Sequence, residues 1–178
     1  MGADIGPVAG RPPPLESPPA ALVTDAQVTY GSYRAPVREV NLLDRWSGLA
    51  RRAHAARLKE WQAAQLVSSD HFVLVAVYDT KTLGILQVVV VEKRSGRISR
   101  FEHKVPTTAL SVGQGLVQTR SVGRWRGLSV TFDNDVDAGT IAVTASAVPR
   151  ASSPGMLLSV DGDCSPRHAG HMVICHPF

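Results

Sequence analysis

The chain has 178 residues, of which 44% are hydrophobic and 19% charged, a balance that excludes an intrinsically disordered protein and suffices for one domain with its own core. The formal net charge is +4 and arginine is spread along the chain, so the composition does not indicate nucleic-acid binding. No segment reaches the roughly 18 apolar residues of a membrane span, and the N-terminus lacks the basic and apolar regions of a secretory signal. We expect a cytoplasmic protein without a cofactor.

The start of the chain predicts an extended leader. Residues 1–20 hold two proline runs, Pro12–Pro14 and Pro18–Pro19. Proline fixes φ and removes a backbone donor, so this segment should be solvated. We expect residues 1–20 to be disordered, the folded domain to comprise residues 21–178, and a first strand at Val23–Tyr30.

A short helix is predicted from Leu43 to Ala56. Alanine and arginine are good helix formers, and Trp46 and Leu49 fall at helical spacing. A basic amphipathic helix can lie on a membrane surface, but the apolar face here is mainly alanine. We therefore favour a helix that plugs or flanks the β structure.

After Leu58 the period of the apolar residues changes to two. Lys59 and Trp61 share one face of a strand, and Glu60 and Gln62 share the other. Long helical crossovers are absent, so the sequence predicts an all-β fold, an antiparallel barrel or sandwich with a short N-terminal helix. The further strands are expected at residues 71–78, 83–92, 97–103, 115–122, 124–132, 140–147, 156–160 and 171–175.

The metal-ligating residue types whose spacing best fits a metal site are Cys164, His168, His171 and Cys175. Thiolate and imidazole are zinc ligands, but a single segment without a paired knuckle seldom wraps a tetrahedral site. The alternative is a small buried cysteine with surface histidines, and we predict no metal site. The glycines of residues 113–115 lack the third glycine of a dinucleotide motif and are interpreted as a turn or bulge.

Three stretches resemble one known family. Gly31–Tyr33, Val40–Leu42 and Arg57–Gln62, followed by Asp70 and a valine-rich strand, are similar to the bacterial domain-of-unknown-function family numbered 2804, and the L-K-E-W run is the most specific part. The resemblance covers about residues 30–178. It implies two tandem lipocalin-like β-barrels, distantly similar to the carotenoid 1,2-hydratase (hydroxyneurosporene synthase) group. This chain matches the first barrel, so we expect a truncated protein whose second barrel is missing.

The resemblance implies a binding module for an apolar, lipid-like or isoprenoid molecule, with Lys59, Glu60, Trp61 and Asp70 as the positions that match. Trp61 and Lys59 would provide an aromatic wall and a charged tip, although Trp61 could instead pack in the core. An alternative is a hydratase-like enzyme in which Glu60 or Asp70 is a carboxylic acid kept protonated in an apolar cavity. A third possibility is half of a barrel pair without independent function.

Overall fold

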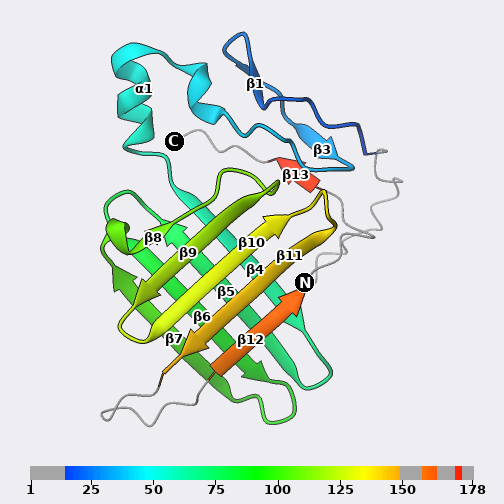
Figure 1. Ribbon diagram of the computed structural model, residues 1–178, viewed down its shortest axis with the longest axis vertical. Helices are drawn as coiled ribbons and strands as arrows, with labels where there is room; N and C mark the ends of the chain where they lie inside the picture. Colours follow the sequence, from blue (N-terminus) through cyan, green and yellow to red (C-terminus); the bar gives the residue numbers. More distant parts are fainter. Residues whose placement is uncertain (1–14, 149–157, 164–170, 174–178) are drawn as a thin grey trace, which may run out of the picture.

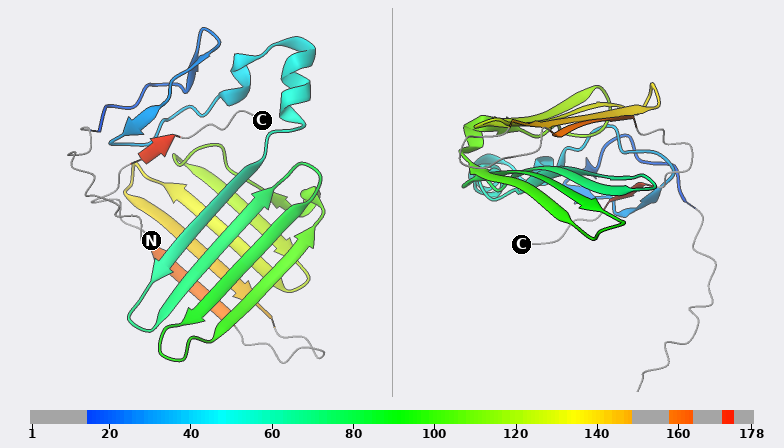
Figure 2. Two further views of the ribbon diagram at one scale, coloured as in Figure 1. Left: turned by 180° about the vertical axis from the view of Figure 1, so that it is seen from behind. Right: turned by 90° about the horizontal axis from the view of Figure 1, so that it is seen from below.

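The computed structural model describes residues 15–148, 158–163 and 171–173. Most of them form two antiparallel sheets that lie face to face as two layers (Figure 1, Figure 2). The first sheet has four strands in chain order: β4 (Glu60–Val67), β5 (His71–Asp79), β6 (Gly84–Glu92) and β7 (Ile98–Val105). The second has five: β8 (Leu110–Ser111), β9 (Thr119–Trp125), β10 (Leu128–Asp135), β11 (Thr140–Ala147) and β12 (Leu158–Asp163). The predicted all-β antiparallel fold is confirmed.

The hydrophobic core fills the space between the two layers. The buried inward-pointing residues of both sheets are mostly branched aliphatic side chains, and Phe132 is the aromatic residue of this cluster. Burial of these side chains supplies the main stabilisation of the fold. Among the described strands no backbone ladder joins the two sheets, so the observed arrangement is a sandwich. The buried cluster comprises Val75, Val77, Leu86, Val88, Val105, Leu110, Leu128, Val130, Phe132, Val143, Ala145 and Ala147.

A smaller N-terminal layer covers one end of the sandwich (Figure 1). It has its own buried cluster of Leu22, Val23, Tyr33 and Val37. A late segment of the chain joins it, because β13 pairs with β3. The elements of this layer are β1 (Val23–Thr24), β2 (Gln27–Val28), β3 (Gly31–Tyr33), the 3-10 helix η1 (Leu42–Arg45), the helix α1 (Gly48–Ala55) and β13 (His171–Val173). Outside this layer, a second 3-10 helix, η2 (Thr107–Ala109), links the two sheets of the sandwich.

The predicted strand Val23–Tyr30 is wrong, because the chain reverses inside it. Asp25 and Ala26 adopt φ values of 52° and 59°, and the two flanking pairs of residues form the β1–β2 hairpin. Two successive residues in the left-handed region produce the tight turn that joins twisted antiparallel strands. Neither residue is glycine or asparagine, so the sequence carries no strong signal for this turn.

The leader predicted at residues 1–20 falls partly outside the described residues, which begin at residue 15. Glu16 takes part in the fold: its amide donates to Ser32 O at 3.2 Å, and the Arg34 amide donates to Glu16 O at 2.9 Å. The N-terminal layer therefore includes residues that composition alone assigned to the leader.

The turn between β9 and β10 lies three residues later than predicted. The sequence pattern separated two strands at Gly123, but Gly123 is inside β9, and the chain turns at Arg126 and Gly127, with φ values of 46° and 89°. A β-carbon built on Gly123 would lie 2.1 Å from Leu86 Cδ2. This glycine therefore allows close packing between the sheets.

The helix α1 is shorter than predicted and does not plug the sandwich. None of its residues is buried, and its principal contact is with η1. In Figure 1 it projects beside the covered end of the sandwich. Within the described part of the chain, no helix is long and apolar enough to cross a membrane.

Candidate functional site

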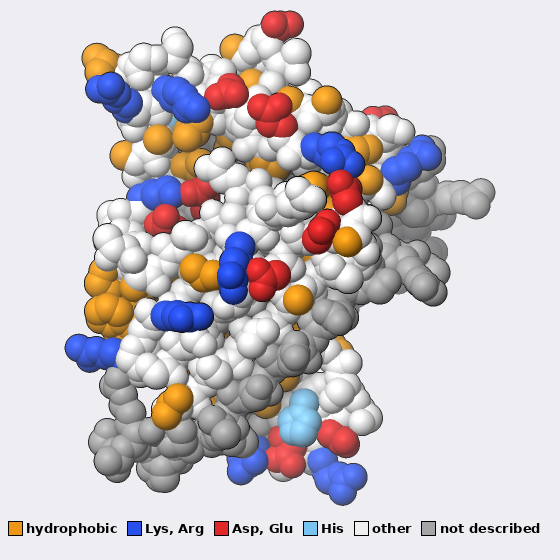
Figure 3. All heavy atoms as spheres, in the orientation of Figure 1, with side chains coloured by type: hydrophobic (Ala, Val, Ile, Leu, Met, Phe, Trp, Pro, Cys, Tyr) orange, Lys and Arg blue, Asp and Glu red, His pale blue; other side chains and the backbone are white. Residues whose placement is uncertain are grey.

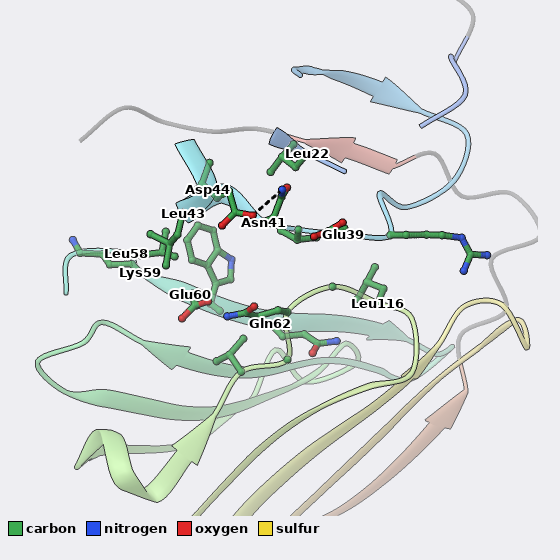
Figure 4. Close-up of a pocket in the computed structure, with 18 of the residues that line it drawn as sticks. Leu22, Glu39, Asn41, Leu43, Asp44, Leu58, Lys59, Glu60, Gln62 and Leu116 are labelled. Atoms are coloured by element: carbon green, nitrogen blue, oxygen red, sulfur yellow. Dashed lines mark hydrogen bonds between the residues drawn. The ribbon is translucent and has the colours of Figure 1, made fainter. Parts of the chain in front are cut away.

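A pocket of about 740 Å³ lies between the covered end of the sandwich and the N-terminal layer (Figure 4). Three stretches supply most of its lining: residues 38–44, residues 58–62 at the start of β4, and residues 112–116 between β8 and β9. Arg51 of α1 and Leu22 also line it. The volume lies in the range of known small-molecule sites. This end pocket is the candidate functional site.

The lining of the end pocket combines apolar and charged side chains. The charged residues come from residues 38–44, from α1 and from residues 58–62, and two of them form an ion pair: Arg51 Nη2 lies 3.1 Å from Asp44 Oδ1. Such a mixture suits a ligand with an apolar body and a polar group. The apolar lining residues are Leu22, Val40, Leu42, Leu43, Leu58, Trp61, Val112 and Leu116, and the charged ones are Arg38, Glu39, Asp44, Arg51, Lys59 and Glu60.

The structure brings three of the four predicted binding residues to the end pocket, namely Lys59, Glu60 and Trp61. Trp61 lies on the outer face of β4 and is 61% exposed, so the alternative of core packing for this residue is wrong. Asp70 lies in the turn between β4 and β5, at the other end of that hairpin, where Ser69 Oγ donates to Asp70 Oδ2 at 3.1 Å. It is not part of the end pocket.

Glu60 is held by an ion pair at the end of the first sheet. Lys81 Nζ donates to Glu60 Oε2 and, at 2.9 Å, to Asp79 Oδ2, and the three side chains are only 16–25% exposed. Burial alone would lower the pKa of Lys81, but hydrogen bonds and charge attraction from Glu60 and Asp79 outweigh it and raise the pKa above its usual 10.5.

Gln62 connects the end pocket to the interior through buried hydrogen bonds. Ser121 Oγ donates to Gln62 Oε1 at 2.6 Å, and Gln62 Nε2 donates to Asn134 Oδ1 at 2.6 Å. The Gly113 amide, from the loop that lines the pocket, donates to Ser121 Oγ at 2.9 Å. Asn134 Nδ2 also donates to Thr119 Oγ1 at 3.1 Å. Each polar side chain that enters the core here has partners, which fixes the base of the pocket.

Sequence reasoning missed this network. One feature could have indicated it: Gln62 lies on the inward face of β4, where an uncharged polar side chain needs a hydrogen-bond partner. The partners, Ser121 and Asn134, lie 59 and 72 positions further along the chain. No local pattern identifies partners at such separations.

Asn41 holds residues 38–44 against the N-terminal layer. Its Oδ1 accepts from the Val23 amide at 2.8 Å, and its Nδ2 donates to Val23 O at 3.0 Å and to Asp44 Oδ2 at 3.1 Å (Figure 4). One asparagine thus satisfies both backbone groups of Val23 and orients Asp44 at the pocket. The stretch opposite the base of the pocket is therefore fixed.

The predicted turn at residues 113–115 lies in the loop that lines the end pocket. Gly115 has φ of 102°, a conformation that side chains with a β-carbon rarely adopt. A β-carbon at Gly113 would lie 3.0 Å from Thr119 Cβ and 3.1 Å from Arg120 O. Both glycines serve the path of the loop, in agreement with the interpretation as a turn.

The metal hypothesis concerns residues that are largely outside the described part of the chain. Cys164, His168 and Cys175 are not among the described residues, and His171 belongs to β13, of whose side chains nothing is described. Among the described residues there is no group of three or more side chains that could hold a metal ion.

Two of the stretches that carry the family resemblance, Val40–Leu42 and the residues from Leu58 to Gln62, meet at the end pocket. They are separated by η1 and α1 in the chain and come together only in the fold. The resemblance itself stays a prediction, because comparison of the chain with protein-family models, with curated proteins and with solved structures gives no significant match.

Proposed function

We propose that the end pocket binds a small lipid-like molecule and that the protein is a binding module for it. The observation that carries the proposal is Trp61, a residue that is 61% exposed on the outer face of β4 and lines the pocket with leucine and valine side chains. An aromatic ring that is left in water beside other apolar side chains in a pocket is stabilised when a ligand covers it.

The ligand would lie at the end of the sandwich and not between the sheets. Twelve buried side chains occupy the interior between the sheets, and protein interiors are packed about as densely as organic crystals. The proposal therefore departs from the lipocalin-like expectation in one respect: the pocket is built by the N-terminal layer together with the edge of the sandwich.

Binding is better supported than the hydratase-like alternative. Acid-catalysed hydration of an apolar double bond needs a carboxylic acid that is protonated near neutral pH. Glu60 is held in an ion pair by Lys81 rather than enclosed among apolar side chains, and Asp70 lies away from the pocket in an exposed turn. Neither residue has the surroundings that such an acid requires.

Tryptophan fluorescence tests the proposal directly. In the variant Trp46→Phe/Trp125→Phe, Trp61 is the remaining tryptophan, and titration with oleate is expected to shift its emission to shorter wavelengths in a saturable manner. The matched control is Trp46→Phe/Trp61→Phe, whose reporter Trp125 is on β9, does not line the pocket and should not respond. Native mass spectrometry of the purified chain should in addition show a bound lipid. An unresponsive Trp61 together with a ligand-free mass would refute the proposal.

A second comparison distinguishes specific binding of oleate in the pocket from nonspecific binding to exposed hydrophobic side chains. Trp61 and Val67 lie on the same face of β4 and are 61% and 67% exposed, but only Trp61 lines the pocket. Trp61→Ala is expected to weaken oleate binding about tenfold, since a large apolar contact is lost, whereas Val67→Ala should leave it unchanged. Equal effects of the two substitutions would contradict a specific site.

A further inference from the structure

Positive charge is concentrated around α1. Residues 45–59 contain five Arg or Lys residues and no Asp or Glu. Their charge exceeds the +4 formal charge of the whole chain, so the remaining residues together carry a slight negative balance. The basic residues of this segment are Arg45, Arg51, Arg52, Arg57 and Lys59.

This basic segment (residues 45–59) is exposed and has little packing against the rest of the fold. No residue of α1 is buried, and Leu49 is 81% exposed. Figure 3 shows Lys and Arg side chains beside hydrophobic ones at the end where Figure 1 places α1. Asp44 offsets part of the charge through Arg51, at 3.1 Å. The helix α1 neither packs on the core nor carries acidic residues. In the isolated chain it therefore gains little stability from contacts with the rest of the fold.

Two aromatic contacts order the apolar side chains next to these charges. The rings of Trp46 and His54 stack with centroids 3.8 Å apart, and the Arg45 guanidinium lies 5.6 Å from the Trp46 ring centroid. Tryptophan beside arginine is a combination that suits the boundary between water and lipid, where the ring meets the acyl region and the cation meets the headgroups.

We propose that the basic segment docks the protein on an anionic membrane surface. Arginine side chains are attracted by acidic headgroups, and Leu49 with Trp46 supplies the apolar contact that inserts at the interface. A nucleic acid would also attract the arginines, but it would leave Leu49 in water, which is why the membrane is the better partner. The docking is peripheral, with α1 lying on the surface.

The docked orientation brings the end pocket to the lipid. Arg51 and Lys59 belong both to the basic segment and to the pocket lining. Docking through this segment therefore positions the pocket beside the membrane, from which a lipid-like ligand is taken up. This consequence rests on the proposed function of the pocket, whereas the docking itself does not.

Co-sedimentation of the full chain with vesicles tests the docking. The expected result is binding to vesicles of phosphatidylcholine with phosphatidylglycerol and no binding to phosphatidylcholine alone. Raising the ionic strength from about 0.1 to about 1 M shortens the Debye length from about 10 to about 3 Å and should reduce binding at least about tenfold. Equal binding to neutral vesicles, or tighter binding to a short DNA duplex than to the anionic vesicles, would overturn the proposal.

Matched variants locate the contact. Arg45→Gln/Arg52→Gln/Arg57→Gln is expected to weaken binding to the anionic vesicles at least about tenfold, and Leu49→Ser should also weaken it. The control, Arg94→Gln/Arg97→Gln/Arg100→Gln, removes the same charge from exposed residues around the β6–β7 turn and should change binding less than about twofold. A loss of equal size in the two triple variants would show attraction by net charge alone and would refute docking through α1.

The two proposals fail separately. Trp61→Ala should weaken oleate binding about tenfold and retain vesicle binding, because Trp61 is not part of the basic segment (residues 45–59). Intact oleate binding without vesicle binding would overturn the docking alone. Vesicle binding by a chain whose Trp61 never responds to oleate would leave the docking standing and remove the function of the pocket.

Discussion

Gln62 and Asn134 are 72 positions apart in the sequence and form a hydrogen bond between the two sheets, with Gln62 Nε2 donating to Asn134 Oδ1 at 2.6 Å. Gln62 is on β4 and lines the end pocket, while Asn134 is on β10 and is 2% exposed. The pair therefore couples the base of the pocket to the packing of the sandwich.

The first prediction concerns this pair. Asn134→Ala leaves the Gln62 amide without its buried acceptor, so the free energy of unfolding should fall by about 1–3 kcal/mol beyond the loss of packing. Ser129→Ala, on the same strand, is the control, because it removes a simpler contact with the Ser146 hydroxyl at 2.8 Å. Urea unfolding measures both. Equal losses for the two variants would show that the buried network contributes no more to the free energy of unfolding than a single hydroxyl–hydroxyl contact.

The second prediction concerns Gly123. Gly123→Ala places a methyl group 2.1 Å from the Leu86 Cδ2 position, in a core where Leu86 is fully buried. Overpacking of this kind should lower the free energy of unfolding by about 1–3 kcal/mol. In the double variant Gly123→Ala/Leu86→Ala the clash is gone, so the two effects should be less than additive by about 1 kcal/mol or more. Strict additivity in urea unfolding would contradict the close approach of the sheets.

Strand positions and faces were predictable because they depend on neighbours in sequence. The period of two after Leu58 put Trp61 and Gln62 on opposite faces of a strand, as the structure has them, but did not tell which face points inward; the strand expected at 140–147 has the bounds of β11. The β9–β10 turn was misplaced for a physical reason: Gly123 looks like a turn residue, but here it makes room for Leu86. A local pattern cannot distinguish these two uses of glycine.

Only part of the lining of the end pocket could be predicted from the sequence. Lys59, Glu60 and Trp61 were found because the resemblance covered them. The loop at residues 112–116 and the hydrogen-bond partners of Gln62, Ser121 and Asn134, reach the pocket because one sheet packs on the other, which no local period encodes. Lys81, the partner of Glu60, was missed because it lies in a hairpin turn 21 positions later, and pairing of β4 with β5 is needed to bring them together.

The third prediction concerns the segment opposite the base of the pocket. Asn41→Ala removes an acceptor from the Val23 amide and a donor from Val23 O, so hydrogen exchange at the Val23 amide should become at least about tenfold faster. Gln114→Ala is the control, since Gln114 also lines the pocket but is exposed and distant from Val23 in the hydrogen-bond network. Unchanged exchange at Val23 in Asn41→Ala would show that the small apolar cluster alone holds this segment.

The fourth prediction is a pH dependence of stability through Lys81. Glu60 and Asp79 raise the pKa of Lys81 in the folded protein above 10.5, the value expected in the unfolded chain. A raised lysine pKa means that the folded state holds the proton more tightly, so its contribution is fully present below pH 10.5 and is lost as the pH rises through the folded pKa. Lys81→Gln should therefore be less stable than the wild-type chain by about 1 kcal/mol near neutral pH. The difference between the two proteins should shrink above pH 10.5. Titration of the other lysines and tyrosines is common to both and cancels in this difference. Urea unfolding of both chains at a series of pH values provides the measurement, and a difference that stays constant or grows at high pH would contradict the role of the ion pair.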